Sequence, residues 1–224
     1  MLVLQAWDET PWMRGLRIDL GAARIRHTQP GQVLKLHLPE GDGFFALATA
    51  PGGGPAELLV ARGGTVADAV IAAAAPGARL EMTAPFGAGF PLAKAEGHDL
   101  LLFAAGSGIA PIRAVAQHVG AHRARFGAVA LYYGQREAAD FAYRAEHAAH
   151  RAAGISVVLC ASRGVDEGEL VAGHVQDVAA ARRLEGIAPD GAVAFLCGPS
   201  AMVSAARDTL AGLGIARDRT FLNF

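Results

Sequence analysis

Cysteine is scarce in this chain of 224 residues, which contains two, Cys160 and Cys197. Zinc sites and iron–sulfur clusters each take about four ligands, so two cysteines alone cannot build either kind of metal site. Each cysteine ends an apolar run typical of a buried strand, residues 155–160 and 192–197. We therefore expect two separate thiols rather than a disulfide, no metal centre, and a reducing, cytoplasmic compartment.

The chain also lacks an excess of charge, long apolar runs and a leader-like start. Its formal net charge is −1, and no block of like charges is present, so nothing in the charge favours a nucleic-acid partner. The apolar run 100–112 is too short to span a bilayer and is interrupted by turn-forming residues. No basic residue precedes Asp8, which is unlike a secretory signal. We expect neither a membrane span nor a nucleic-acid ligand.

What the chain does have is apolar content, 52%, enough for a large core. The first part contains short segments with strand character, separated by Gly- and Pro-rich turns. These segments are residues 2–6, 13–20, 33–38, 44–48, 57–61 and 79–82. Such regularly spaced short strands predict an antiparallel β-barrel, in which Trp7 and Trp12 are expected to pack. One helix is predicted over residues 65–75, with Thr65 as its N-cap.

From about residue 98 the pattern changes to strands that alternate with alanine-rich helices. The predicted strands are 100–104, 128–133, 156–160, 192–197 and 220–222, and the predicted helices are 110–125, 137–153, 175–184 and 200–213. This alternation predicts a doubly wound α/β domain with a parallel sheet. We therefore expect two domains, residues 1–96 and 97–224, divided within the polar stretch 92–98.

Two glycine turns follow predicted strands in the second domain. Gly106-Ser107-Gly108 precedes Pro111, and Cys197 precedes Gly198-Pro199. Free N–H groups and a helix dipole at such turns favour a pyrophosphate, although ordinary strand-to-helix turns are the alternative. The first turn is not the usual Rossmann fingerprint, which has a third glycine where Pro111 stands. Because both turns lie at the carboxyl edge of one sheet, together they can hold one extended ligand.

The ordered set of three motifs resembles the ferredoxin–NADP reductase superfamily. The motifs are residues 106–111 (GSGIAP), 133–136 (YGQR) and 197–202 (CGPSAM), and the resemblance extends to residues 30–32 and 84–90 in the first domain. It implies an FAD-binding barrel joined to an NAD(P)-binding domain. The implied activity is hydride transfer from NADPH or NADH to FAD, with electrons passed to an unidentified acceptor, a protein being one option. The motifs are most similar to stand-alone reductases and the dihydroorotate dehydrogenase electron-transfer subunit, without its iron–sulfur cluster.

For FAD, the resemblance implies two binding segments in the barrel. They comprise Phe44, Phe45, Ala46, Leu47, Ala48 and Thr49, and then Arg62, Gly63, Gly64 and Thr65. Phe45 stands where the family has a tyrosine that stacks on the flavin ring, and it can still stack. Gly43 stands where the family has an arginine that pairs with the pyrophosphate, and Ala46 replaces a flavin-contacting serine. Both departures predict weaker retention of FAD.

For NAD(P), the resemblance implies a binding set spread over four turns. The set is Gly106, Ser107, Gly108, Pro111, Arg136, Ser162, Arg163, Gly198, Pro199 and Met202. Cys197 is expected beside the nicotinamide, and Phe224 is expected to cover the flavin. Arg163 would suit the 2′-phosphate of NADPH, but a solvated loop arginine is as good an interpretation, so NADPH and NADH both stay open.

Other candidates are weaker. His118 and His122 are expected at the surface, because no nearby acid or metalloprotease motif accompanies them, and His147 and His150 receive the same interpretation. Ser107 lacks the flanking glycines of a nucleophile elbow, which disfavours a hydrolase. Two alternatives to a stand-alone reductase stay open: a regulatory module that binds flavin weakly, and a reductase component active only within a larger complex.

Overall fold

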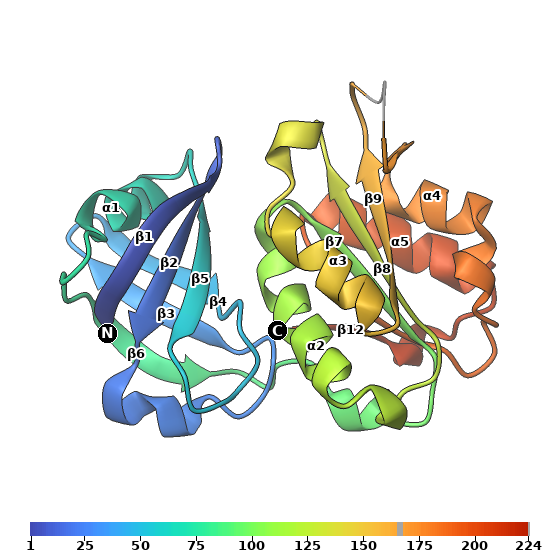
Figure 1. The fold of residues 1–224 in the computed structure, drawn as a ribbon, viewed down its shortest axis with the longest axis horizontal. Helices are drawn as coiled ribbons and strands as arrows, with labels where there is room; N and C mark the ends of the chain where they lie inside the picture. The colour runs from blue at the N-terminus through green and yellow to red at the C-terminus, as the bar shows by residue number, and fades with distance from the viewer. Residues whose placement is uncertain (165–167, 224) are drawn as a thin grey trace.

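The N-terminal half forms two three-stranded antiparallel sheets (Figure 1), as seen in a computed structural model that describes residues 1–164 and 168–223. One sheet has the order β1 (Leu2–Thr10), β2 (Met13–Asp19), β5 (Ala56–Ala61), and the other has the order β4 (Gly41–Ala46), β3 (Val33–Leu38), β6 (Glu81–Phe86). Isolated bridges Leu2–Arg79 and Leu47–Leu58 connect the two sheets on both sides. The predicted antiparallel barrel is therefore confirmed.

The barrel encloses its own apolar core because its strands alternate inward and outward residues. Leu34 and Leu36 of β3 are fully buried, and Lys35 between them is not. The single barrel helix, α1 (Thr65–Ala73), follows β5, and Val70 buries its inner face. The N-cap of α1 is Gly64 rather than the predicted Thr65, and no side chain makes a capping hydrogen bond there. Instead, the Asp68 carboxylate accepts a hydrogen bond from the Gly63 N–H (3.0 Å) and occupies this helix start.

The C-terminal half is a six-stranded parallel sheet. Its order is β10 (Leu170–Ala172), β9 (Ile155–Ala161), β8 (Val129–Gln135), β7 (Leu100–Ala105), β11 (Val193–Cys197), β12 (Thr220–Leu222). Helices α2 (Ile109–Ala121) and α3 (Arg144–Ala152) cover the face nearer the barrel, and α4 (Val175–Ala181) and α5 (Ser200–Gly212) cover the other (Figure 1). The strand order reverses between β7 and β11, which places a ligand crevice at their carboxyl ends.

The predicted helix over 137–153 is shorter in the structure. Residues Ala138–Asp140 form a 3₁₀ turn, and Tyr143 takes a left-handed conformation with φ 58° before α3 begins. The buried Tyr133 hydroxyl holds this turn by accepting a hydrogen bond from the Ala142 N–H (3.2 Å). β10 was not predicted from the sequence. The remaining 3₁₀ turns are Gly21–Arg26, Leu92–Lys94, Gly106–Gly108, Arg123–Arg125, Arg183–Gly186 and Arg217–Arg219.

One apolar cluster passes from the barrel into the parallel-sheet half. Met13, Ala48 and Leu59 of the barrel belong to the same cluster as Ile112 and Val115 of α2. Burial of apolar area against α2 therefore helps fix the barrel to the sheet. The connection between the halves runs through residues 87–99, and the division after residue 96 stays a prediction.

Several sequence expectations about single residues are corrected. Trp12 is 64% exposed at the β1–β2 turn rather than packed in the barrel, whereas Trp7 covers Gly15. His147 and His150 are buried, not at the surface, because the inner face of α3 carries them toward β9. Both cysteines are free thiols, as expected. Within the described residues, no helix combines the length and apolar character needed to cross a bilayer.

Two buried histidines predict acid-sensitive stability. Burial lowers the pKa of His27 to about 4, and burial together with His150 lowers the pKa of His147 to about 4. The ordinary value is about 6.5, so below that pH the unfolded chain binds more protons than the folded one. The contribution of these histidines to the free energy of unfolding should be greatest above pH 6.5. It should fall by about 2 kcal/mol per histidine between pH 7 and 5.

Urea unfolding at pH 7, 6 and 5 measures this fall. H147F should reduce the loss between pH 7 and 5 by about 2 kcal/mol, since one of the proton-binding groups is gone. An unchanged pH dependence in H147F would show that His147 is not the group responsible.

Candidate functional site

A cavity of ≈ 960 Å³ lies between the barrel and the carboxyl ends of β7 and β11. The barrel contributes Val33, Phe44, Phe45, Ala46, Leu59, Ala61, Ala67 and Phe86, and the other half contributes Ala105, Gly106, Ser107, Gly108, Ala110, Pro111, Cys197, Gly198, Pro199 and Asn223. Its wall is mostly apolar and, on the barrel side, aromatic. Such a cavity suits a flat organic ring system with few polar groups.

The two glycine turns are in direct contact at one end of this cavity. A Cβ on Gly108 would lie 2.3 Å from the Cys197 carbonyl oxygen and 2.8 Å from the Gly198 nitrogen. Gly106 has φ +59°, a left-handed conformation that glycine adopts without strain. The glycines therefore allow two loops from distant parts of the sequence to meet backbone against backbone at the switch point of the sheet.

A second cavity, of ≈ 520 Å³, continues along the carboxyl edge of the parallel sheet. It contains the predicted residues Gly106, Arg136, Ser162, Pro199 and Met202, together with Ala105, Gly134, Gln135, Cys160, Gly173, His174, Val175, Gln176 and Ala201. Arg163 does not line it but follows directly, and its N–H donates to the Arg136 carbonyl (2.8 Å). The ends of β8 and β9 thus carry two exposed arginines at the rim.

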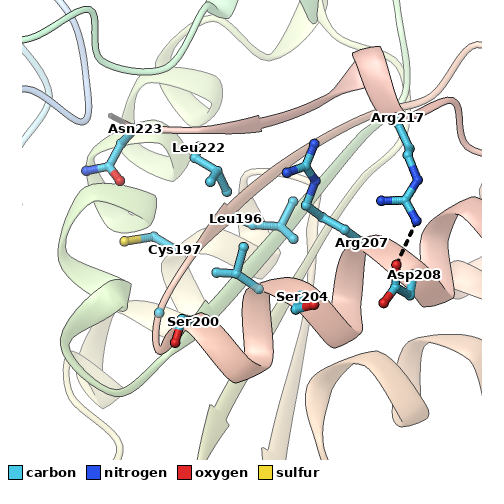
Figure 2. A pocket seen from close by; sticks show the side chains of 11 residues that line it. Leu196, Cys197, Ser200, Ser204, Arg207, Asp208, Arg217, Leu222 and Asn223 are labelled. Atoms are coloured by element: carbon cyan, nitrogen blue, oxygen red, sulfur yellow. Dashed lines mark hydrogen bonds and ion pairs between the residues drawn. The ribbon is translucent and has the colours of Figure 1, made fainter.

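A third cavity, of ≈ 470 Å³, lies between α5 and β12 (Figure 2). Figure 2 shows Arg217 paired with Asp208 (2.7 Å) at its outer end, and Cys197 and Asn223 at its inner end. Cys197 and Asn223 also line the cavity between barrel and sheet, so the two spaces adjoin.

Cys197 presents a neutral thiol to this site. Burial raises its pKa to about 11, so the thiol is protonated at neutral pH. A protonated thiol is a poor nucleophile, and Cys197 can serve only by contact and weak hydrogen bonding. Phe224, the other predicted catalytic position, lies outside the described residues.

The first predicted FAD segment divides between cavity and core. Phe44, 64% exposed, and Phe45 face the cavity with Ala46, while Leu47 and Ala48 are fully buried. The Thr49 hydroxyl accepts a hydrogen bond from the Glu57 N–H (3.3 Å) within the barrel. Only the first three residues of this segment therefore line the cavity.

The second predicted segment lies outside the cavity. Arg62 pairs with Asp8 (2.7 Å), and Gly63, Gly64 and Thr65 are exposed at the start of α1. Ala67, in the first turn of α1, lines the cavity. A phosphate at this helix start would have to displace the Asp68 carboxylate from the Gly63 N–H.

The sequence interpretation missed two side chains that the fold buries with a polar atom unsatisfied. The Oδ1 atom of Asn223, a residue 3% exposed, and the Oε1 atom of Gln176 have no hydrogen-bond partner among the described residues. Asn223 lines the barrel–sheet cavity, and Gln176 lines the one beside it. Unsatisfied buried acceptors are costly, so each fits a ligand that donates a hydrogen bond there. Gln176 falls in a stretch that the sequence interpretation treated as structural only.

Comparison with known proteins identifies the second half of the chain. Residues 102–208 match the family described as the oxidoreductase NAD-binding domain. The whole fold superposes on an Amycolatopsis cytochrome P450 reductase with a TM-score of 0.86 and 25% identity, covering 99% of this chain and 68% of that one. In its NAD-binding region and in its whole fold, the chain is similar to proteins of the ferredoxin–NADP reductase superfamily. A ferredoxin–NADP⁺ reductase from Neisseria gonorrhoeae with bound FAD and NADP has the same fold, with a TM-score of 0.84, 18% identity and 98% and 95% coverage.

Two curated relatives are longer than the chain. The reductase component of propane 2-monooxygenase from Rhodococcus jostii is 28% identical over 86% of this chain and 54% of its own length. The gamma subunit of sulfhydrogenase 1 from Pyrococcus furiosus is 26% identical over 87% of this chain and 67% of its own length. The chain therefore spans about half of the first relative and two thirds of the second.

Close backbone contact at the switch point predicts that Gly108 tolerates no side chain. G108A would place a methyl group against the Cys197 carbonyl and force the two turns apart. We expect a loss of about 1–3 kcal/mol in the free energy of unfolding, measured with urea, and at least tenfold weaker NAD(P)H binding by calorimetry.

The matched control is G212A. No atom lies within 4 Å of a Cβ at Gly212, the last residue of α5, so this change should leave both measurements intact or add slightly to stability. Equal effects of G108A and G212A would refute the steric explanation.

Proposed function

We propose that the protein is an NAD(P)H-dependent flavoprotein reductase, in which nicotinamide delivers hydride to FAD and the electrons pass on to a further acceptor. One observation carries the proposal. A single cavity joins the aromatic pair Phe44 and Phe45 of the barrel to Gly106 and Cys197 at the switch point of the NAD-binding sheet. Hydride transfer needs two flat rings in contact and no protein acid or base, and the apolar wall agrees with that chemistry.

The residues present fit the ring system of a flavin. Phe44 and Phe45 offer aromatic faces at the cavity, and Phe86 lies edge-on to Phe44 with ring centroids 6.2 Å apart. The unsatisfied Oδ1 atom of Asn223 would accept a hydrogen bond from a ring N–H or a carboxamide N–H. A bound flavin supplies the hydride acceptor and the ability to release single electrons.

The residues at the far end of the cofactor fit less well. Gly43 has no side chain where the family has an arginine that binds the pyrophosphate. A Cβ at Gly43 would lie 2.7 Å from the Phe45 ring and 2.8 Å from Val66, so this position has no room for one. The start of α1 is the remaining candidate for the pyrophosphate, and Asp68 competes for it. We infer that FAD is held chiefly by its ring and dissociates readily.

The acceptor is proposed to be a protein. Three of the similar proteins are named as a reductase component of a monooxygenase, a cytochrome P450 reductase and a subunit of a sulfhydrogenase. Each name points to another protein, as a component, a subunit or the reductase of a cytochrome, and we propose the same kind of partner for this chain. The free thiols of Cys160 and Cys197 agree with a reducing compartment, for which the cytoplasm is the proposal.

The decisive measurement is the visible spectrum of the purified protein with FAD added in excess, before and after anaerobic NADPH or NADH. We expect flavin absorption that bleaches with nucleotide and FAD that is lost on gel filtration. A protein that takes up no FAD would overturn the proposal in favour of a regulatory module. Flavin that bleaches but reduces no small acceptor would favour a component that needs its complex.

The choice between NADPH and NADH should depend on the rim arginines. R136A/R163A removes the two guanidinium groups next to the second cavity, where a 2′-phosphate would make charge-assisted hydrogen bonds. If NADPH is the substrate, its Kd should rise at least tenfold, while that of NADH changes little.

R125A serves as the control, because it removes a positive charge of the same half that pairs with Glu96 away from this cavity. Equal weakening of both nucleotides in R136A/R163A would show that these arginines do not read the 2′-position.

A further inference from the structure

A buried arginine crosses the contact between barrel and NAD-binding half. Arg113 is 6% exposed and lies on α2, one helical turn after Ile109, where the helix begins beyond the Gly106–Gly108 turn. It does not line the cavity between barrel and sheet. A charged side chain is rarely buried without a partner that holds it, so its contacts indicate what it does.

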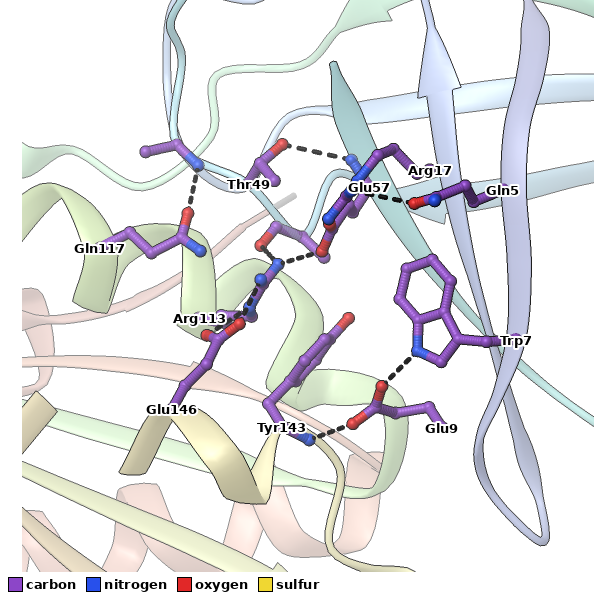
Figure 3. Close-up of polar contacts among 12 residues, drawn as sticks. Gln5, Trp7, Glu9, Arg17, Thr49, Glu57, Arg113, Gln117, Tyr143 and Glu146 are labelled. Atoms are coloured by element: carbon purple, nitrogen blue, oxygen red, sulfur yellow. Dashed lines mark hydrogen bonds and ion pairs between the residues drawn. The ribbon is translucent and has the colours of Figure 1, made fainter. Parts of the chain in front are cut away.

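Every nitrogen of the Arg113 guanidinium has an acceptor (Figure 3). The Nε and Nη2 atoms donate to both oxygens of Glu146 on α3 (2.7 and 2.5 Å). On the barrel side, Nη1 donates to the Ala48 carbonyl (2.8 Å) and pairs with Glu57 on β5 (2.8 Å). The guanidinium also lies over the Tyr143 ring, 4.2 Å from its centroid. One side chain therefore binds α3 and two barrel segments at once.

The barrel side of this contact leads directly to the proposed flavin wall. Ala48 follows Phe45 by three residues and Ala46 by two, and its N–H donates to the Glu57 carbonyl (2.8 Å). The Glu57 carboxylate is held in turn by Arg17 of β2 (2.9 Å). Arg113 thus binds the segment that carries Phe45 at Ala48, which is also hydrogen-bonded to Glu57 within the barrel.

Two further hydrogen bonds run across the same contact (Figure 3). The Ala50 N–H donates to Gln117, one turn after Arg113 on α2 (3.0 Å), and the Tyr143 N–H donates to Glu9 of β1 (2.6 Å). α2 is therefore fixed at its start to the nucleotide turn and along its side to residues 48–50. Relative movement of the two ring-binding walls would break these bonds.

We propose that Arg113 is a positioning residue that sets the approach of nicotinamide to flavin by locking the segment after Phe45 against α2. This inference rests on the proposed reductase function. Hydride transfer is sensitive to distance, and a displacement of about 1 Å can cost 10²-fold in rate. Burial alone lowers the pKa of Arg113, but the hydrogen bond and charge of Glu146 outweigh it and raise the pKa. The guanidinium therefore stays charged at every working pH.

Removal of Arg113 is feasible because its partners keep other contacts. In R113M, Glu57 retains Arg17, and Glu146 lies 3.9 Å from His150. R113K keeps the charge but not the planar fork that serves α3 and the barrel together. The control R151M deletes an arginine–glutamate pair of similar length, Arg151–Glu169 (2.8 Å), within the NAD-binding half.

The first readout uses the protein without flavin. Hydrogen exchange followed by mass spectrometry should show faster exchange in R113M for peptides that contain Ala50 and Tyr143, with strands β7 and β11 unchanged. R151M should exchange like the wild type at both places. Unchanged protection in R113M would mean that Arg113 does not hold the contact and would overturn the inference.

The second readout is anaerobic stopped-flow bleaching of protein saturated with FAD. At saturating NAD(P)H, the rate constant for R113M should fall between about 10- and 100-fold, with the nucleotide Kd within about threefold of wild type. R113K should recover part of the rate, and R151M should match the wild type. If R113M fails to fold, R113K is compared with the wild type instead, and its bleaching rate constant should also fall, by a smaller factor.

Two outcomes separate this inference from the proposed function. Wild-type protein that bleaches normally, with R113M equally fast, would overturn the positioning role and leave the reductase intact. Wild-type protein that takes up no flavin would overturn the reductase proposal, and the positioning role would fall with it.

Discussion

Everything at the functional site depends on the close approach of two backbone turns. The order of the parallel sheet reverses between β7 and β11, so the chain leaves these neighbouring strands toward opposite faces and opens a crevice at their ends. Gly108 brings the first turn against the Cys197 carbonyl of the second. This contact can form only without a side chain at Gly108, and it makes one continuous floor for a ligand from two loops far apart in the sequence.

The barrel supplies the opposite wall, and its placement matters as much as its fold. An apolar cluster shared with α2 and a polar chain through Arg17, Glu57, Arg113 and Glu146 hold it there. Charged groups at this contact are fully paired, which is the condition under which burial of charge is tolerated. The result is an aromatic wall that faces a glycine-rich floor across a single cavity.

The superfamily and fold class were predictable from the residues, whereas several local features were not. The ordered motifs at Gly106, Arg136 and Cys197 pointed to the ferredoxin–NADP reductase superfamily, and the regularly spaced short strands indicated the barrel. The left-handed Tyr143 and the short α3 were missed, because a hydroxyl ten residues earlier in sequence, on Tyr133, holds that turn. Arg113 looked like an ordinary helical residue, since burial between two halves leaves no mark in a local pattern.

By itself the sequence determined the element types, the superfamily and the positions of the glycine turns, because strand periodicity and turn chemistry are local properties. It also determined that no arginine stands at position 43. Only the tertiary structure decided that Phe45 and Val66 occupy the space beside Gly43, that Asp68 fills the start of α1, and that Asn223 and Gln176 bring unsatisfied oxygens to the cavities. Val66 contacts Gly43 only because α1 packs on the barrel, and Asn223 reaches the Gly31 carbonyl (3.3 Å) only because the two halves meet, so a local pattern shows neither contact.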